Sequence, residues 1–134
     1  MPHCVILYTP NIEAKTDLDA LCRKLADTML TIRDEAGKQV FPTGGTRVLA
    51  YPAAHYAVAD GKGDYAFVYI NVRMGPGRSP EVQKGAGDRL LEVIKEHFAP
   101  VFEQELIGIT LQIDDSPGQV YDAKHSTLHP LFNK

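Results

Sequence analysis

A strand, a helix and a second strand follow one another twice within 134 residues, and this repeated order limits the fold more than any other feature of the sequence. Runs of β-branched and aromatic residues mark the strands, and apolar residues at three- and four-residue spacing mark the helices. The expected elements are, in chain order, a strand over 3–8, a helix over 18–32, a strand over 46–51, a strand over 65–72, a helix over 80–101 and a strand over 107–113.

Side-chain signals predict where the two helices begin. Thr16 or Asp17 can cap the first helix, and Gly37 ends its apolar pattern. Ser79 followed by Pro80 is a favoured pairing of a cap with the first helical residue. The two halves share this architecture with negligible sequence identity.

The predicted fold class is α/β (α+β), with two consecutive β-α-β units that form one four-stranded mixed sheet. Each crossover is expected to be right-handed, which makes the two strands of a unit parallel and places both helices on one face. The length suits a single domain over residues 1–134, with halves of about 2–60 and 61–115 and a tail over 116–134. A hydrophobic content of 44% is enough for a core.

Two helices can cover only one face of such a sheet. The other face is expected to be partly apolar, from the alternating residues Val5, Leu7, Phe67, Tyr69, Leu111 and Ile113. Burying this face between copies of the chain is the economical solution, and closed cyclic symmetry is the usual form. The sequence therefore predicts a homo-oligomer.

Charge and composition exclude several kinds of partner. The net charge is −3 and no basic run occurs, which argues against nucleic-acid binding. No apolar stretch approaches the ~20 residues of a membrane span, and the first residues lack the pattern of a secretion signal. Cys4 and Cys22 lack metal or redox spacing, so we interpret them as buried thiols in a reducing cytoplasm.

Residue 2 is a proline directly after the initiator methionine. Removal of the methionine would leave a free secondary amine, and an α-amine titrates near ~8 before any perturbation. Burial and positive neighbours could make this amine a neutral base at physiological pH. The strand that follows would fix it on rigid backbone. Pro2 is therefore a candidate proton-transfer residue.

Three segments together carry a resemblance to a known family. They are Met1-Pro2-His3, the run Phe41-Pro42-Thr43-Gly44-Gly45-Thr46-Arg47, and Tyr65-Ala66-Phe67-Val68 followed by Gly75-Pro76-Gly77-Arg78-Ser79. The chain resembles the 5-carboxymethyl-2-hydroxymuconate isomerases, a branch of the tautomerase superfamily. The resemblance implies a tautomerase-like homotrimer that uses neither cofactor nor metal.

The resemblance also implies an isomerase reaction of the keto-enol tautomerase type, in which a C=C bond is transposed. A dienol, 5-carboxymethyl-2-hydroxymuconate, becomes its conjugated 2-oxo isomer in homoprotocatechuate (4-hydroxyphenylacetate) degradation. By motif, Pro2 transfers the proton, and Arg47 and Arg78 bind the carboxylated substrate. Arginine suits this role because its planar guanidinium binds a carboxylate through two parallel hydrogen bonds.

The segment over residues 32–40 is longer than the family pattern, and no role for it follows from the sequence. Two other functions stay open. The same amine could act on another 2-hydroxydienoate or on a phenylpyruvate-like enol. Alternatively, the chain could be a trimeric binding protein with an inert proline.

Overall fold

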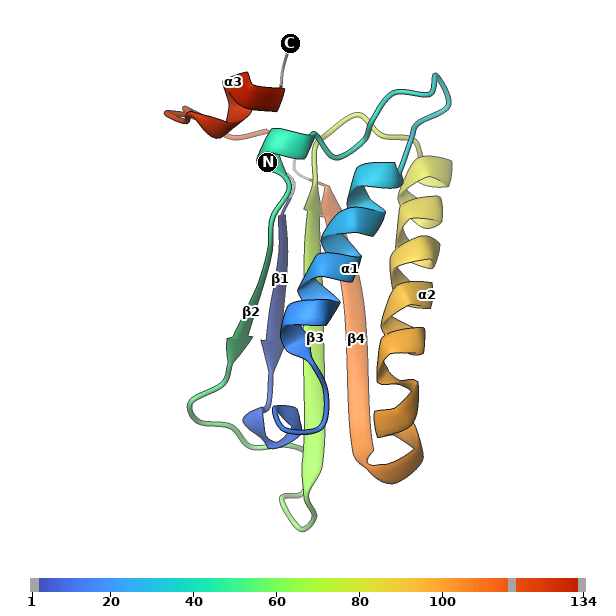
Figure 1. The fold of residues 1–134 in the computed structure, drawn as a ribbon, viewed down its shortest axis with the longest axis vertical. Helices are drawn as coiled ribbons and strands as arrows, with labels where there is room; N and C mark the ends of the chain where they lie inside the picture. The colour runs from blue at the N-terminus through green and yellow to red at the C-terminus, as the bar shows by residue number, and fades with distance from the viewer. Residues whose placement is uncertain (1–2, 116–117, 133–134) are drawn as a thin grey trace.

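The computed structural model describes residues 3–115 and 118–132. Figure 1 shows a single sheet with two long helices packed against it. The elements in chain order are β1 (His3–Tyr8), η1 (Pro10–Ile12), α1 (Leu18–Thr31), η2 (Thr43–Gly45), β2 (Val48–Pro52), β3 (Tyr65–Met74), α2 (Pro80–Gln104), β4 (Leu106–Asp115) and α3 (Leu128–Phe132).

The sheet has four strands in the order β2-β1-β3-β4. β1 pairs in parallel with β2, and β3 pairs in parallel with β4. β1 and β3 join the two units in antiparallel fashion. The predicted mixed sheet of two β-α-β units is therefore confirmed, with α1 and α2 on one face.

The core lies between that face and the two helices. Alternate residues of β1 and β3 point into it, as the period of two along a strand requires. Its fully buried members include Ile6 and Ile70 from the sheet, Leu21 and Met29 from α1, and Leu90, Ile94 and Phe98 from α2.

The caps of both helices follow the predictions. The Asp17 side chain accepts a hydrogen bond from the Ala20 amide at 3.0 Å. Ser79 Oγ accepts one from the Val82 amide at 3.2 Å, with Pro80 next in the chain. Each cap satisfies one of the amides that the first turn of a helix leaves without a partner.

Two predicted element boundaries differ from those in the structure. The second strand begins at Val48 instead of residue 46, because Thr43–Gly45 forms a 3-10 turn and the Thr46 hydroxyl donates to the Pro42 carbonyl at 2.8 Å. The buried apolar face of the second helix ends at Val101 as predicted, but α2 continues through exposed residues to Gln104. Neither change alters the order of the strands.

The face of the sheet away from the helices is partly apolar, as predicted, but two of its predicted members are wrong. Leu111 and Ile113 pair with the core residues Ile70 and Val72 and pack on the helix side. The cause is register. In β3 the odd-numbered side chains point outward, whereas in β4 they point inward. The exposed apolar residues on this outer face include Leu7, Leu49, Tyr51 and Phe67.

The tail ends in the short helix α3, which contacts η2. A Cβ placed on Gly44 would lie 3.1 Å from the His129 Cα, so this contact brings two backbones close together. The tail stays largely exposed on the single chain, including Tyr121 and Phe132. Within the described residues, no helix has the length and apolar character that crossing a membrane requires.

The two cysteines differ in burial. Cys4 is buried, and this burial raises the pKa of its thiol to about 12. Cys22 is only partly buried, and burial also raises its pKa. Both thiols therefore stay protonated near neutral pH, which makes them poor nucleophiles.

Candidate functional site

The predicted site residues belong to one edge of the sheet. β1 and β2 begin at this edge and β3 and β4 end at it, because β3 runs antiparallel to β1. Figure 1 shows the start of β1, η2 and α3 at the same end of the molecule. Arg47 directly precedes β2, and Arg78 lies in the turn between β3 and α2.

Pro2 lies outside the described residues, so its role stays a prediction. The described part of β1 begins one residue later, at His3, which pairs with Arg73 near the end of β3. The Cys4 amide donates to the Arg47 carbonyl at 2.9 Å. The beginning of β1 therefore runs directly beside the backbone of Arg47.

Arg47 is exposed just before β2. Its Nη1 donates to the Gly45 carbonyl at 3.3 Å. It lines a cleft of about 510 Å³ together with Asp19 and Arg23 of α1 and Phe132 of α3. The described lining of this cleft includes no residue of the turn that carries Arg78. The single chain thus places the two predicted arginines at the same edge, and Arg78 is not among the described residues that line the Arg47 cleft.

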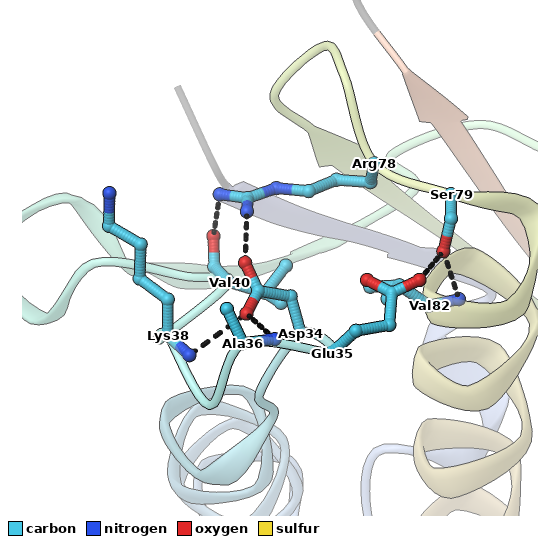
Figure 2. Close-up of polar contacts among 8 residues, drawn as sticks. All are labelled: Asp34, Glu35, Ala36, Lys38, Val40, Arg78, Ser79 and Val82. Carbon is cyan, nitrogen blue, oxygen red and sulfur yellow. Dashed lines mark hydrogen bonds and ion pairs between the residues drawn. The ribbon is translucent and has the colours of Figure 1, made fainter.

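Arg78 follows a tight turn in which Gly77 has a φ of +89°. That conformation favours glycine, because other residues meet a steric penalty there. The Arg78 guanidinium lies across the 32–40 segment (Figure 2). Nη1 contacts Asp34 Oδ2 at 3.3 Å, and Nη2 donates to the Val40 carbonyl at 3.3 Å.

One donor of Arg78 lacks an acceptor within the described part of the chain. Nε is buried, and none of the described residues accepts a hydrogen bond from it. A buried donor without a partner costs about 1–3 kcal/mol, and such groups are rare in native structures. A carboxylate ligand is the kind of acceptor that would pair with it.

The same segment also contacts the start of α2. The Ser79 hydroxyl donates to Glu35 Oε2 at 2.5 Å, and this hydrogen bond is the main reason that the pKa of Glu35 is lowered. An anion is favoured near a helix N-terminus. In this structure, a carboxylate of the chain itself binds there.

A second hollow lies at the opposite edge of the sheet. It has a volume of about 750 Å³ and extends over the outer face, with a lining that includes Leu7, Tyr56, Val58, Phe67 and Leu106. None of the described residues that line it carries a charge, and none of them is a predicted site residue.

The sequence did not predict the acidic partners of Arg78 and Ser79. Asp34 and Glu35 sit in a polar turn that is typical of a solvated loop, and only the tertiary fold brings this turn against the residues after β3. The unusual length of the 32–40 segment was the one available signal.

The strand order and the paired β-α-β units place the chain in the tautomerase-like class of folds. Comparison with known proteins then identifies the family. The model of the 5-carboxymethyl-2-hydroxymuconate isomerase family matches residues 2–132. The chain belongs to this family.

Individual relatives agree with this assignment. The 5-carboxymethyl-2-hydroxymuconate Delta-isomerase of Escherichia coli is 33% identical over 132 residues, which is 98% of this chain and 99% of that protein. A solved 5-carboxymethyl-2-hydroxymuconate delta-isomerase is 53% identical, with a TM-score of 0.94, over 100% of this chain and 94% of the other. A solved 5-carboxymethyl-2-hydroxymuconate isomerase from Deinococcus radiodurans R1 is 31% identical, with a TM-score of 0.84 and coverage of 99% and 95%.

Proposed function

We propose that this chain is a cofactor-independent isomerase that converts 5-carboxymethyl-2-hydroxymuconate to its conjugated 2-oxo isomer. The observation that carries the proposal is the family match, which extends over nearly the whole chain and includes Pro2, Arg47 and Arg78. The reaction would serve homoprotocatechuate breakdown, as the family resemblance implies.

In the proposed mechanism, the amine of Pro2 accepts the proton of the 2-hydroxyl group and returns a proton to carbon. Pro2 directly precedes His3 in the sequence, and β1 begins at His3 at this edge of the sheet. Arg47 and Arg78 are also at that edge. Their charges favour the neutral amine and stabilise the negative charge that develops on the dienolate.

The proposed roles of the two arginines differ. Arg78 has a buried donor without an acceptor among the described residues, which supports carboxylate binding. Arg47 is exposed and lines a cleft between β2 and α1. We assign it to a second carboxylate of the substrate.

An ultraviolet assay tests the proposal, because isomerisation changes the conjugation of the substrate. Steady-state rates should be compared on 5-carboxymethyl-2-hydroxymuconate, on a smaller 2-hydroxydienoate and on phenylpyruvate enol. The proposal requires the highest kcat/KM on the first. A preference for a smaller monoacid would favour another tautomerase, and no turnover of any of them would favour a binding protein.

The outer face of the sheet supports a homotrimer. Leu7, Leu49, Tyr51 and Phe67 are between 38% and 48% exposed on the single chain, and the hollow beside them has no charged lining. Burial of such residues is favourable by roughly 25 cal/mol per Å² of apolar area. We therefore place the interfaces between subunits on this face.

Replacing Phe67 with lysine tests that placement. We expect Phe67→Lys to weaken assembly by roughly 100-fold, since it removes a buried aromatic side chain and introduces a charge. Light scattering should show a mass near 14.8 kDa at concentrations where the unmodified protein has about three times that mass. Phe102→Lys is the matched control, because Phe102 is 53% exposed on α2 instead of the sheet. Equal masses for the two variants would contradict the placement.

An amine base also predicts a pH dependence. Below its pKa the amine is protonated and cannot accept a proton, so kcat/KM should fall about tenfold per pH unit on the acidic side. Positive neighbours move this inflection below the ~8 of a free α-amine. Rates measured across this range should show one ionisation, and a flat profile would contradict an amine base.

Histidine ionisation has to be separated from this effect. Burial, followed by the charge of Lys24, lowers the pKa of His97, whose ring lies 2.8 Å from the Thr16 hydroxyl. The His97→Gln variant lacks the titrating imidazole of α2. The pH at which kcat/KM falls should be the same in this control as in the unmodified protein.

A further inference from the structure

The carboxylate of Asp34 is fixed by its own turn. Its Oδ1 accepts hydrogen bonds from the Ala36 amide at 3.0 Å and from the Lys38 amide at 2.9 Å. Backbone hydrogen bonds from Gly37 to Asp34 and from Asp34 to Lys38 close the turn, and Gly37 adopts a φ of +78°. With Oδ1 held by two amides, the direction of Oδ2 is set before any ligand arrives.

Oδ2 is the atom that meets Arg78, and both groups are well shielded. The Asp34 side chain is 17% exposed and that of Arg78 is 24% exposed. Figure 2 shows the Asp34 and Val40 oxygens on the same side of the guanidinium. In a guanidinium, the Nε hydrogen points to the side opposite Nη1. The edge that carries Nε–H therefore faces away from Asp34.

We propose that Asp34 is a positioning residue, which holds Arg78 by Nη1 and keeps its Nε edge for a carboxylate of the substrate. The inference rests on the proposed function of Arg78. It also gives the long 32–40 segment a role, because that segment supplies both the carboxylate and the Val40 carbonyl. Nε has no acceptor among the described residues, and a bound carboxylate that displaces the atoms covering it would provide one.

The contact distances argue against a purely stabilising pair. Both contacts to Arg78 are 3.3 Å, longer than the ~2.7–2.9 Å of a tight charge-assisted hydrogen bond. A pair with such geometry adds little to stability, whereas a fixed direction for the guanidinium affects ligand binding directly. The two roles predict different kinetic changes.

Asp34→Asn separates them. Oδ1 of the asparagine can still accept from the two turn amides, so the turn is kept. Its Nδ2 then faces Nη1, and two donors cannot pair. We expect KM for the muconate to rise about tenfold while kcat changes less than about twofold, because binding of the ground state and of the transition state weakens alike. A role limited to folding would instead lower kcat through inactive protein and leave KM unchanged.

Two further variants complete the test. Glu35→Gln is the matched control, since it neutralises the next carboxylate of the same turn without touching Arg78, and its KM should stay within about twofold. In an Arg78→Ala background, Asp34→Asn should add nothing to KM, because residues that act through one contact are non-additive. An unchanged KM for Asp34→Asn, or fully additive effects, would overturn the inference.

A measurement without substrate keeps the inference separable from the proposed function. The side-chain Nε–H signal of Arg78 in ¹⁵N NMR should be slow to exchange in the ligand-free protein, and faster by at least about tenfold in Asp34→Asn, since loss of the pair frees the guanidinium. Equal exchange would show that Asp34 does not fix Arg78. If the unmodified protein fails to convert the muconate, the proposed function falls, and this exchange comparison still decides whether Asp34 positions Arg78.

Discussion

Pro2→Ala should lower kcat/KM on the muconate by roughly 100-fold, while the fold and the oligomer stay as they are. General acid–base catalysis contributes about 10²–10⁴-fold, and we expect the lower end because alanine also leaves a free α-amine after removal of Met1. That amine is primary and differs in basicity from the secondary amine of proline. Stopped-flow or steady-state ultraviolet rates, with intact mass to confirm the new terminus, provide the measurement.

The control for this prediction is a protein whose N-terminal amine is blocked. Acylation of the unmodified protein turns the amine into an amide, which cannot accept a proton, so activity should vanish instead of falling by two orders of magnitude. Retention of Met1 should have the same effect, since Pro2 is then an amide nitrogen. Full activity in either blocked form would exclude the amine as the base, and full activity in Pro2→Ala would exclude a special role for proline.

The fold could be predicted from the sequence because its signals are local. The alternation in 65–72, the cap at Ser79 and the apolar spacing from Leu18 to Ile32 each report on residues a few positions apart. The parallel pairing of the two strands within each unit then follows from the two crossovers. The prediction that Leu111 and Ile113 lie on the outer face was wrong because its signal is not local. The faces of these residues depend on the register between β3 and β4, which no short-range pattern contains.

The site was harder to predict, for the same physical reason. Arg78 could be assigned because the segment Gly75-Pro76-Gly77-Arg78-Ser79 resembles the family motif. Its partner Asp34 is 44 residues away in the chain. Only the packing of the 32–40 segment against the β3–α2 turn joins them. A sequence shows a chemically suitable residue more readily than it shows what holds that residue in place.

Arg78→Ala should reduce kcat/KM by about 100-fold, because charge-assisted hydrogen bonds contribute roughly 1.5–3 kcal/mol each and 1.4 kcal/mol corresponds to a factor of ten. The loss should appear mainly in KM if Arg78 binds a carboxylate that is unchanged during the reaction, and in kcat if it stabilises the dienolate. Thermal unfolding and light scattering should match the unmodified protein, since the contacts of Arg78 within the chain are long.

Two other arginine variants make this result specific. Arg78→Lys restores the charge but not the planar fork, so its kcat/KM should lie between that of the unmodified protein and that of Arg78→Ala. Arg89→Ala removes an exposed cation from α2 and should leave kcat/KM within about twofold, because an exposed charge on the helix layer is screened by solvent. If Arg78→Ala unfolded, or if Arg89→Ala lost as much activity, Arg78 would be a structural residue or a general source of positive charge. The Arg78→Lys variant separates a bidentate carboxylate contact from a general positive charge, since only the bidentate contact needs the geometry of arginine.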